Sequence, residues 1–300
     1  MAFSAQDVKN LREQTGCGMM DCKKALTESD GDFEKAIEYL REKGLAAVQK
    51  KAGRVASEGL VYAVADQEKN VGAMVEVNSE TDFVAKNESF REFVQQVAKV
   101  VLEKDPADLE ALLAADLNGQ TVEAALTEKI QVIGENLKIR RFVRYEGPCV
   151  AYIHGGGTHA VLVQFNTDLA AKPEFQAYGK DVAMQIAAAN PQYLNREAVP
   201  ASVVEKEKEI LTVQAVNEGK PEAIAQKMVM GRINKFYKEN CLLEQPFVKN
   251  DEINVGDYTA NTAKELGGSI EIIAFTRYEK GEGIEKKEDD FAAEVAGMVK

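Results

Sequence analysis

Apolar residues in the first 54 positions recur every three or four residues, which is the spacing of one face of an α-helix. The residues at this spacing are Val8, Leu11, Phe33, Ile37 and Leu40. Ser4 stands three positions before Asp7, an arrangement similar to a capping box. This part of the chain is therefore predicted to be helical, with a first helix that begins near Ser4.

Two breaks divide the helical segment into three. Glycines flank Cys17, and residues 30–32 read Asp-Gly-Asp, which is typical of a turn. We expect the second helix over residues 21–29 and the third to end near Gly44. Residues 50–54 are rich in lysine and arginine and are predicted to form a basic linker.

A second pattern occurs twice after this segment. Residues 60–64 and 71–77 are apolar runs separated by a polar turn, and residues 150–153 and 160–165 repeat the arrangement. Short apolar runs between turns are typical of strands. Each pair is followed by an amphipathic helix, and the first of these has capping-box spacing at residues 89–92. The apolar faces of the two helices consist of Phe90, Phe93, Val94, Val97 and Val101 in the first and Phe175, Tyr178, Val182 and Ile186 in the second.

The repeat therefore predicts an α+β fold with two related subdomains, each an antiparallel sheet with helices on one side. Residues 200–244 interrupt the second subdomain with a helical pattern that breaks at Gly219-Lys220-Pro221. Two helices with a tight joint form an antiparallel hairpin. The apolar positions that we expect along it are Val204, Ile210, Leu211, Ala215, Ile224, Met228, Gly231 and Phe236.

Taken together, these patterns divide the chain into five parts. The expected parts are a three-helix domain with its linker at 1–54, a first core subdomain at 55–145, a second core subdomain at 146–199 and 245–280, a helical hairpin (coiled coil) at 200–244, and a terminal helix at 281–300. Asp289 and Asp290 can cap that terminal helix.

Composition narrows the class of protein. The chain has 300 residues and a net charge of −12, which argues against direct binding of nucleic acid, because phosphate neutralisation requires clustered Lys and Arg. Its apolar runs are shorter than a membrane span, and residues 1–4 do not resemble a signal peptide. We expect a soluble, cytoplasmic protein without membrane association.

The sequence contains no complete motif for catalysis, cofactor binding or metal binding. The four cysteines are few and scattered, which predicts reduced, packed thiols rather than disulfides or a zinc site. The chain lacks Walker A and Rossmann glycine patterns. Residues 154–157 read His-Gly-Gly-Gly, which is more typical of a hairpin turn than of an esterase oxyanion loop. We therefore expect no enzyme activity, no cofactor and no metal.

Residues 78–86, Asn-Ser-Glu-Thr-Asp-Phe-Val-Ala-Lys, follow the strand predicted at 71–77 and precede a helix. A weaker copy at residues 166–172 has leucine in place of the phenylalanine. A structural interpretation makes Thr81 a helix N-cap and places Phe83 in the core. A functional interpretation makes this junction a binding loop on a rigid scaffold.

Residues 81–86, Thr-Asp-Phe-Val-Ala-Lys, resemble the signature of the bacterial elongation factor Ts family. Further segments that resemble the family are Thr15–Leu26, Ile133–Asn136, Ile139–Arg141, Gly219–Pro221 and Asp290–Val295. They occur in the family's order along almost the whole chain, and the two repeat units resemble its long form. The first 54 residues are similar to the small ubiquitin-associated (UBA) fold.

The resemblance implies a guanine-nucleotide exchange factor that acts on elongation factor Tu during translation. In the family, the segment that matches Thr81, Asp82, Phe83 and Val84 enters the partner's nucleotide-binding domain beside the bound magnesium ion. Phe83 would act there as a wedge, with Asp82 alongside. We expect Asp168 and Leu169 of the weaker copy to be structural.

The resemblance implies further contacts with the partner. The residues concerned are Leu11, Arg12, Met19, Met20, Ile133, His154, Phe291, Val295 and Met298. His154 would reach a second domain of the partner. The alternatives are loop packing for the methionines, a turn position for His154, and docking on the chain's own body for the last three.

Two questions stay open from the sequence. A helical adaptor that uses its UBA-like segment to bind proteins, without exchange activity, is the alternative function. The hairpin could join two copies of the chain into a homodimer or touch the partner, and Met228, Met230 and Phe236 fit either an interface or the seam of the hairpin itself.

Overall fold

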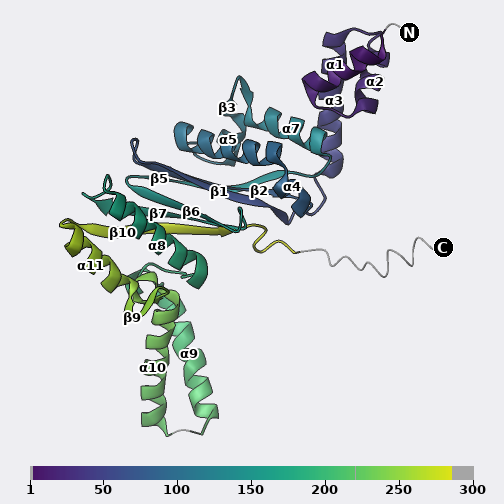
Figure 1. The fold of residues 1–300 in the computed structure, drawn as a ribbon. Helices are drawn as coiled ribbons and strands as arrows, with labels where there is room; N and C mark the ends of the chain where they lie inside the picture. The colour runs from purple at the N-terminus through teal and green to yellow at the C-terminus, as the bar shows by residue number, and fades with distance from the viewer. Residues whose placement is uncertain (1–2, 220, 286–300) are drawn as a thin grey trace. The chain divides into compact units, whose positions relative to one another are not determined.

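A computed structural model describes residues 3–219 and 221–285. The chain forms two compact units: Met1–Tyr62, Val75–Phe142 and Glu279–Lys300 make up the first, and Ala63–Met74 and Val143–Tyr278 the second. The fold class is α+β, as predicted, with three-stranded sheets and a separate set of helices near the N-terminus (Figure 1). The finer division into five parts stays a prediction, and the expected terminal helix lies largely outside the described residues.

The first unit begins with three helices: α1 (Ala5–Thr15), α2 (Met19–Glu28) and α3 (Phe33–Lys51). The capping box at Ser4 is confirmed, since Ser4 and Asp7 exchange backbone and side-chain hydrogen bonds. Gly16 ends α1 with a φ of 68°, a left-handed conformation that glycine adopts at low cost. The buried core of these helices consists of Val8, Leu11, Cys17, Cys22, Ala25, Leu26, Ala36 and Leu40.

Two expectations about these helices are wrong. Helix α2 begins at Met19 rather than Asp21, and α3 continues past Gly44 to Lys51, so that Lys50 and Lys51 are helical and not part of a linker. Glycine inside a helix costs about 1 kcal/mol relative to alanine, which is tolerable where packing compensates. A Cβ on Gly44 would lie 2.5 Å from Oε1 of Gln131, so glycine admits that side chain against α3.

The first sheet has the strand order β1 (Glu58–Asp66), β2 (Val71–Ser79), β5 (Lys138–Glu146). Every residue of β2 is buried. The helices that follow β2 are α4 (Asp82–Lys86), α5 (Glu88–Lys104), α6 (Leu109–Ala114) and α7 (Val122–Ile133), with a small pair β3 (Asp116–Leu117) and β4 (Gln120–Thr121) before α7. Figure 1 shows α5 and α7 on one face of this sheet.

The predicted apolar face of α5 is confirmed, because all five of its residues are buried. The predicted capping box is wrong. Asn87 is the N-cap, and its Oδ1 accepts hydrogen bonds from the backbone of Phe90 and the hydroxyl of Ser89. Ser89 therefore lies inside the first turn.

The second unit contains the sheet β10 (Ile270–Glu279), β7 (His159–Thr167), β6 (Cys149–His154). Strands β6 and β7 are antiparallel and joined by the predicted glycine turn, with His154 opposite His159. Helices α8 (Pro173–Ala189) and α11 (Val255–Leu266) pack in the same core, beside the short pair β8 (Pro246–Phe247) and β9 (Asn250–Asn254). The predicted apolar face of α8 is confirmed, since its four residues are all buried.

Helices α9 (Ala201–Asn217) and α10 (Glu222–Asn240) form the predicted hairpin, side by side in Figure 1. Their seam consists of Leu211, Val229 and Ile233, with Tyr237 packed against them. The apolar stripe expected on α10 is therefore displaced by one residue, from Met228 and Phe236 to Val229 and Tyr237, which also lie at helical spacing. Ile224 is exposed, and Met228 and Phe236 are half-buried.

Candidate functional site

The segment singled out in the sequence joins the end of β2 to α4. Thr81 is the N-cap of α4, as the structural interpretation expected, and Val84 is buried. Phe83 is 77% exposed, so the core position that the structural interpretation gave it is wrong, and the ring is free to contact a partner as the functional interpretation requires. Since neighbouring residues of a helix point about 100° apart, the burial of Val84 turns Phe83 outward.

The exposed side of α4 carries charges around the Phe83 ring. Nζ of Lys86 donates to Asp82 at 2.7 Å and lies 5.7 Å from the centroid of the Phe83 ring, within the range of a cation–π contact. This hydrogen bond from Lys86 holds the pKa of Asp82 below its usual value. Asp82 therefore keeps a negative charge beside the exposed ring at neutral pH.

In the weaker copy of the segment, the residue that corresponds to Phe83 is buried and not exposed. Leu169 is only 4% exposed and belongs to the core of the second unit. Asp168 accepts hydrogen bonds from the backbone and hydroxyl of Ser269, at 2.7 and 3.1 Å. The structural role expected for Asp168 and Leu169 agrees with this placement.

Two carboxylates hold the turn that precedes α4. The backbone N–H and the hydroxyl of Thr81 both donate to Glu135, at 2.9 and 2.6 Å. In the opposite direction, the backbone N–H of Asn136 donates to Glu80 at 2.6 Å. Sequence reasoning matched residues 133–136 to a family but gave Glu80, Glu135 and Asn136 no role. The local signal in the sequence was one acidic residue, Glu135, directly after a turn glycine, Gly134.

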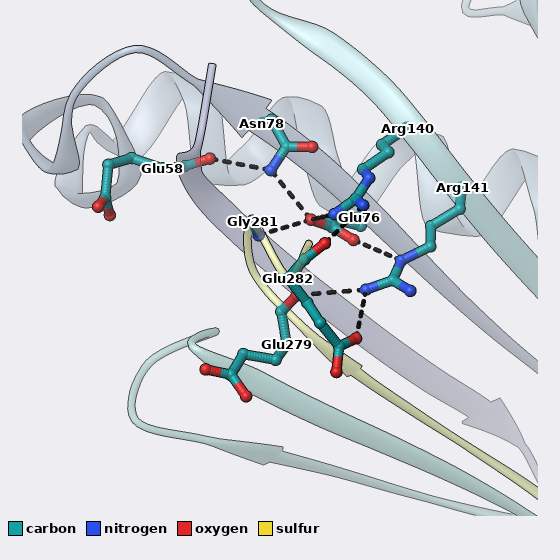
Figure 2. A network of polar contacts seen from close by, with 8 residues as sticks. All are labelled: Glu58, Glu76, Asn78, Arg140, Arg141, Glu279, Gly281 and Glu282. Atoms are coloured by element: carbon teal, nitrogen blue, oxygen red, sulfur yellow. Dashed lines mark hydrogen bonds and ion pairs between the residues drawn. The ribbon is translucent and has the colours of Figure 1, made fainter. Parts of the chain in front are cut away.

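Glu76, which lies in β2 before the turn, is fully buried. Figure 2 shows its carboxylate surrounded by donors. Oε1 accepts from Arg140 at 3.1 Å, from Asn78 at 3.0 Å and from the backbone N–H of Gly281 at 2.8 Å, while Oε2 accepts from Arg141 at 2.5 Å. A buried carboxylate needs this many partners, because desolvation of the charge is otherwise unfavourable.

The same two arginines bind the chain after β10. The guanidinium of Arg140 donates to the carbonyl of Glu282 at 2.6 Å, and Arg141 donates to the carboxylate of Glu282 at 3.1 Å. Gly281 has a φ of 69°, and a Cβ there would lie 2.0 Å from the carbonyl oxygen of Ser57. Residues 279–282 are thus fastened to the strand that ends in the Phe83 segment.

The other residues of the first unit that are expected to bind a partner differ in their exposure. Met19 and Met20 are 44% and 72% exposed at the start of α2. Arg12 is exposed and Ile133 is half-buried. Leu11 is fully buried in the core of the three helices, so it offers no surface to a partner and that expectation is corrected.

Val132 is a residue that sequence reasoning missed. It is 43% exposed on α7, and it lies 3.4 Å from the position that a Cβ on Gly16 would take. It therefore presents apolar surface near the loop between α1 and α2.

His154 belongs to the second unit, where it is exposed at the end of β6. Its ring contacts the hydroxyl of Tyr152 at 3.0 Å, which fits a turn residue as well as a contact residue. Phe291, Val295 and Met298 lie outside the described residues.

All four cysteines are buried with free thiols, as expected. Within residues 3–219 and 221–285, His, Cys, Asp and Glu do not gather in any group of three or more that could hold a metal ion. Over the same residues, no helix has both the length and the apolar character needed to cross a bilayer.

Comparison with known proteins gives consistent matches. The family model described as Elongation factor TS matches residues 80–282. Elongation factor Ts of Clostridium botulinum (strain Alaska E43 / Type E3) is 52% identical over 298 residues, which cover 98% of each chain. Elongation factor Ts of Trichlorobacter lovleyi is 52% identical over 305 residues, or 99% of this chain and 98% of the relative. That of Syntrophotalea carbinolica is 50% identical over 305 residues, which cover 100% of both.

Proposed function

Because the chain belongs to the elongation factor Ts family, we propose that it binds elongation factor Tu carrying GDP and promotes release of that GDP, so that GTP can bind. Its role is that of a translation elongation factor and not of an enzyme that makes or breaks covalent bonds. We also propose that the chain acts in the cytoplasm, where translation takes place.

The exposure of Phe83 is the observation that carries the proposal. A phenylalanine that is 77% exposed on a short helix leaves apolar surface in water. Burying such a side chain against a partner gains about 2 kcal/mol. The surrounding turn is held by Glu135 and Glu80, so the ring is presented on an ordered support.

The proposed mechanism acts on the partner's magnesium ion. Mg²⁺ requires near-ideal octahedral coordination by oxygen atoms and water. Insertion of Phe83 beside the ion, with Asp82 alongside, displaces the loops that hold those ligands and weakens the binding of the diphosphate. The binding of this chain and the binding of GDP then weaken each other by the same factor.

Other contacts are proposed with the same partner. Arg12, Met19, Met20 and Ile133 would bind its nucleotide-binding domain, and His154 would reach a second domain. Three more contacts are proposed from the sequence alone, which are Phe291, Val295 and Met298. Val132 joins the first group because it is exposed near Gly16, whereas Leu11 would only support the fold of that region.

The hairpin carries further exposed apolar side chains. These are Ile210, Val213 and Val216 on α9 and Ile224 and Met230 on α10. They support an interface, either with a second copy of the chain or with the partner, and the two alternatives stay open.

The function is tested with purified elongation factor Tu loaded with fluorescent GDP and chased with excess unlabelled GDP. We expect the native chain to speed the release of the labelled nucleotide and, at saturation, to lower the equilibrium affinity of elongation factor Tu for GDP by a factor of roughly 5 to 150, the usual range of coupling between two ligands. The reciprocal measurement is the affinity of the chain for the partner, which saturating GDP should lower by the same factor. Release at the spontaneous rate in the presence of excess chain would contradict the proposal.

A further inference from the structure

The turn that presents Phe83 depends on a residue far away in the sequence. Glu135 lies 54 positions after Thr81, just beyond the end of α7, and one oxygen of its carboxylate accepts the backbone N–H of Thr81 while the other accepts the hydroxyl. Hydrogen bonds to a charged acceptor are shorter and stronger than those between neutral groups. The carboxylate therefore fixes both the backbone and the side chain of Thr81.

The bond made by the Thr81 hydroxyl departs from the usual behaviour of an N-cap. A threonine at this position normally accepts a hydrogen bond from the first turn of its own helix. Within the described residues, the side chain of Thr81 makes no such bond to α4. Its hydroxyl donates to Glu135 instead. The local stabilisation of α4 is given up for a contact that orients the helix on the first unit.

A second carboxylate makes the attachment reciprocal. Glu80, the residue before Thr81, accepts the backbone N–H of Asn136, the residue after Glu135. Glu80 also lies 3.5 Å from the guanidinium of Arg54, and the side-chain amide of Asn136 donates to the carbonyl of Arg54 at 2.7 Å. Residues 80–81 and residues 135–136 are thus joined by hydrogen bonds in both directions.

Helix α4 cannot maintain this orientation by its own hydrogen bonds. It has five residues, whereas isolated helices of fewer than about 12–15 residues are marginal in water. Its attachment comes from the buried side chain of Val84 and from the crossed carboxylates before it. Phe83 lies between these two attachments.

We infer that Glu135 is a positioning residue for nucleotide exchange: its carboxylate fixes Thr81 and thereby presents Phe83 to the partner in the orientation that binds. The inference rests on the proposed function. Without this contact, only a fraction of the free molecules has α4 in the binding orientation, and the apparent affinity falls by that fraction. The complex, once formed, still contains the same wedge.

The test measures GDP release from elongation factor Tu as a function of the concentration of the chain. For Glu135→Ala, we expect the half-saturating concentration to rise by about tenfold, with the maximal release rate within about twofold of native. Glu135→Gln should restore most of the affinity, because its amide can accept from the Thr81 N–H and donate to the Thr81 hydroxyl. Glu123→Ala, an exposed carboxylate in the first turn of α7, is the matched control and should leave both values unchanged.

A second comparison separates positioning from a general structural role. In a chain that already carries Phe83→Ala, Glu135→Ala should raise the half-saturating concentration by less than about twofold, since there is no ring left to position. An equal, additive loss in that background would overturn the inference, as would a native half-saturating concentration for Glu135→Ala alone.

If Glu135→Ala does not fold, Thr81→Val takes its place. It removes the hydroxyl bond and keeps the backbone bond to Glu135, so we expect a rise of about threefold, restored by Thr81→Ser. Native behaviour of Thr81→Val would then overturn the inference. Failure of the proposed function is recognised separately, because the native chain itself would not accelerate GDP release.

Discussion

Replacing Phe83 with alanine is expected to lower the chain's acceleration of GDP release by about 30-fold, since roughly 2 kcal/mol of burial energy is lost. The ring is 77% exposed in the free chain, so its removal takes little packing away from the folded state. The free energy of unfolding should therefore change by less than about 0.5 kcal/mol. Release of fluorescent GDP and thermal unfolding of the same preparation provide the two measurements.

The weaker copy of the segment supplies the matched control. Leu169→Ala truncates the corresponding residue, which is buried in the second unit, and should cost about 2–5 kcal/mol of stability. Exchange activity per folded molecule should stay near native. Phe83→Ala is therefore expected to lower exchange and leave stability nearly unchanged, whereas Leu169→Ala is expected to lower stability and leave exchange nearly unchanged. An equal loss of exchange in both variants, at the same folded fraction, would remove the special role of Phe83.

Replacing Glu76 with alanine is expected to destabilise the chain by about 3–5 kcal/mol, the range measured when one partner of a buried ion pair is removed. Its carboxylate accepts from Arg140, Arg141, Asn78 and the backbone of Gly281, and all four donors lose this buried acceptor together (Figure 2). Denaturant unfolding of native and variant chains measures the loss.

Glu282→Ala is the control for this prediction. It also removes a carboxylate that faces Arg141, but the side chain of Glu282 is 45% exposed, and Arg140 still donates to the backbone carbonyl. Exposed ion pairs contribute at most about 1 kcal/mol, so this variant should unfold close to the native midpoint. A Glu76→Ala chain as stable as Glu282→Ala would mean that the buried network contributes little.

Helical faces were predictable from the sequence because they rest on periodicity over several turns. The apolar faces of α5 and α8 are buried as expected. Periodicity failed where the segment was short or the pattern ambiguous. Helix α4 has five residues, too few for a period to show whether Phe83 or Val84 points inward. In α10, Met228 and Phe236 form one possible stripe and Val229 and Tyr237 another, and packing against Leu211 selects the stripe of Val229.

The supporting contacts of the site could not be predicted for a different reason. Glu76 lies inside an apolar run, and its partners Arg140 and Gly281 are 64 and 205 positions away. Glu135 reaches Thr81 across 54 positions. Such pairs follow from the tertiary fold and leave no local pattern. Leu11 shows that a resemblance to a family can also mislead. It was expected to contact a partner, but it is fully buried in the core of the three helices.

The proposed wedge at the magnesium site is tested most directly by GDP release measured with and without saturating chain, first in excess Mg²⁺ and then with the ion chelated. Chelation alone should speed spontaneous release, because the ion holds the diphosphate. If Phe83 acts by disturbing that ion, the factor by which the native chain accelerates release should be large in excess Mg²⁺ and should shrink once the ion is gone. For Phe83→Ala the factor should be small under both conditions. A native factor that is the same with and without Mg²⁺ would contradict the wedge at the magnesium site.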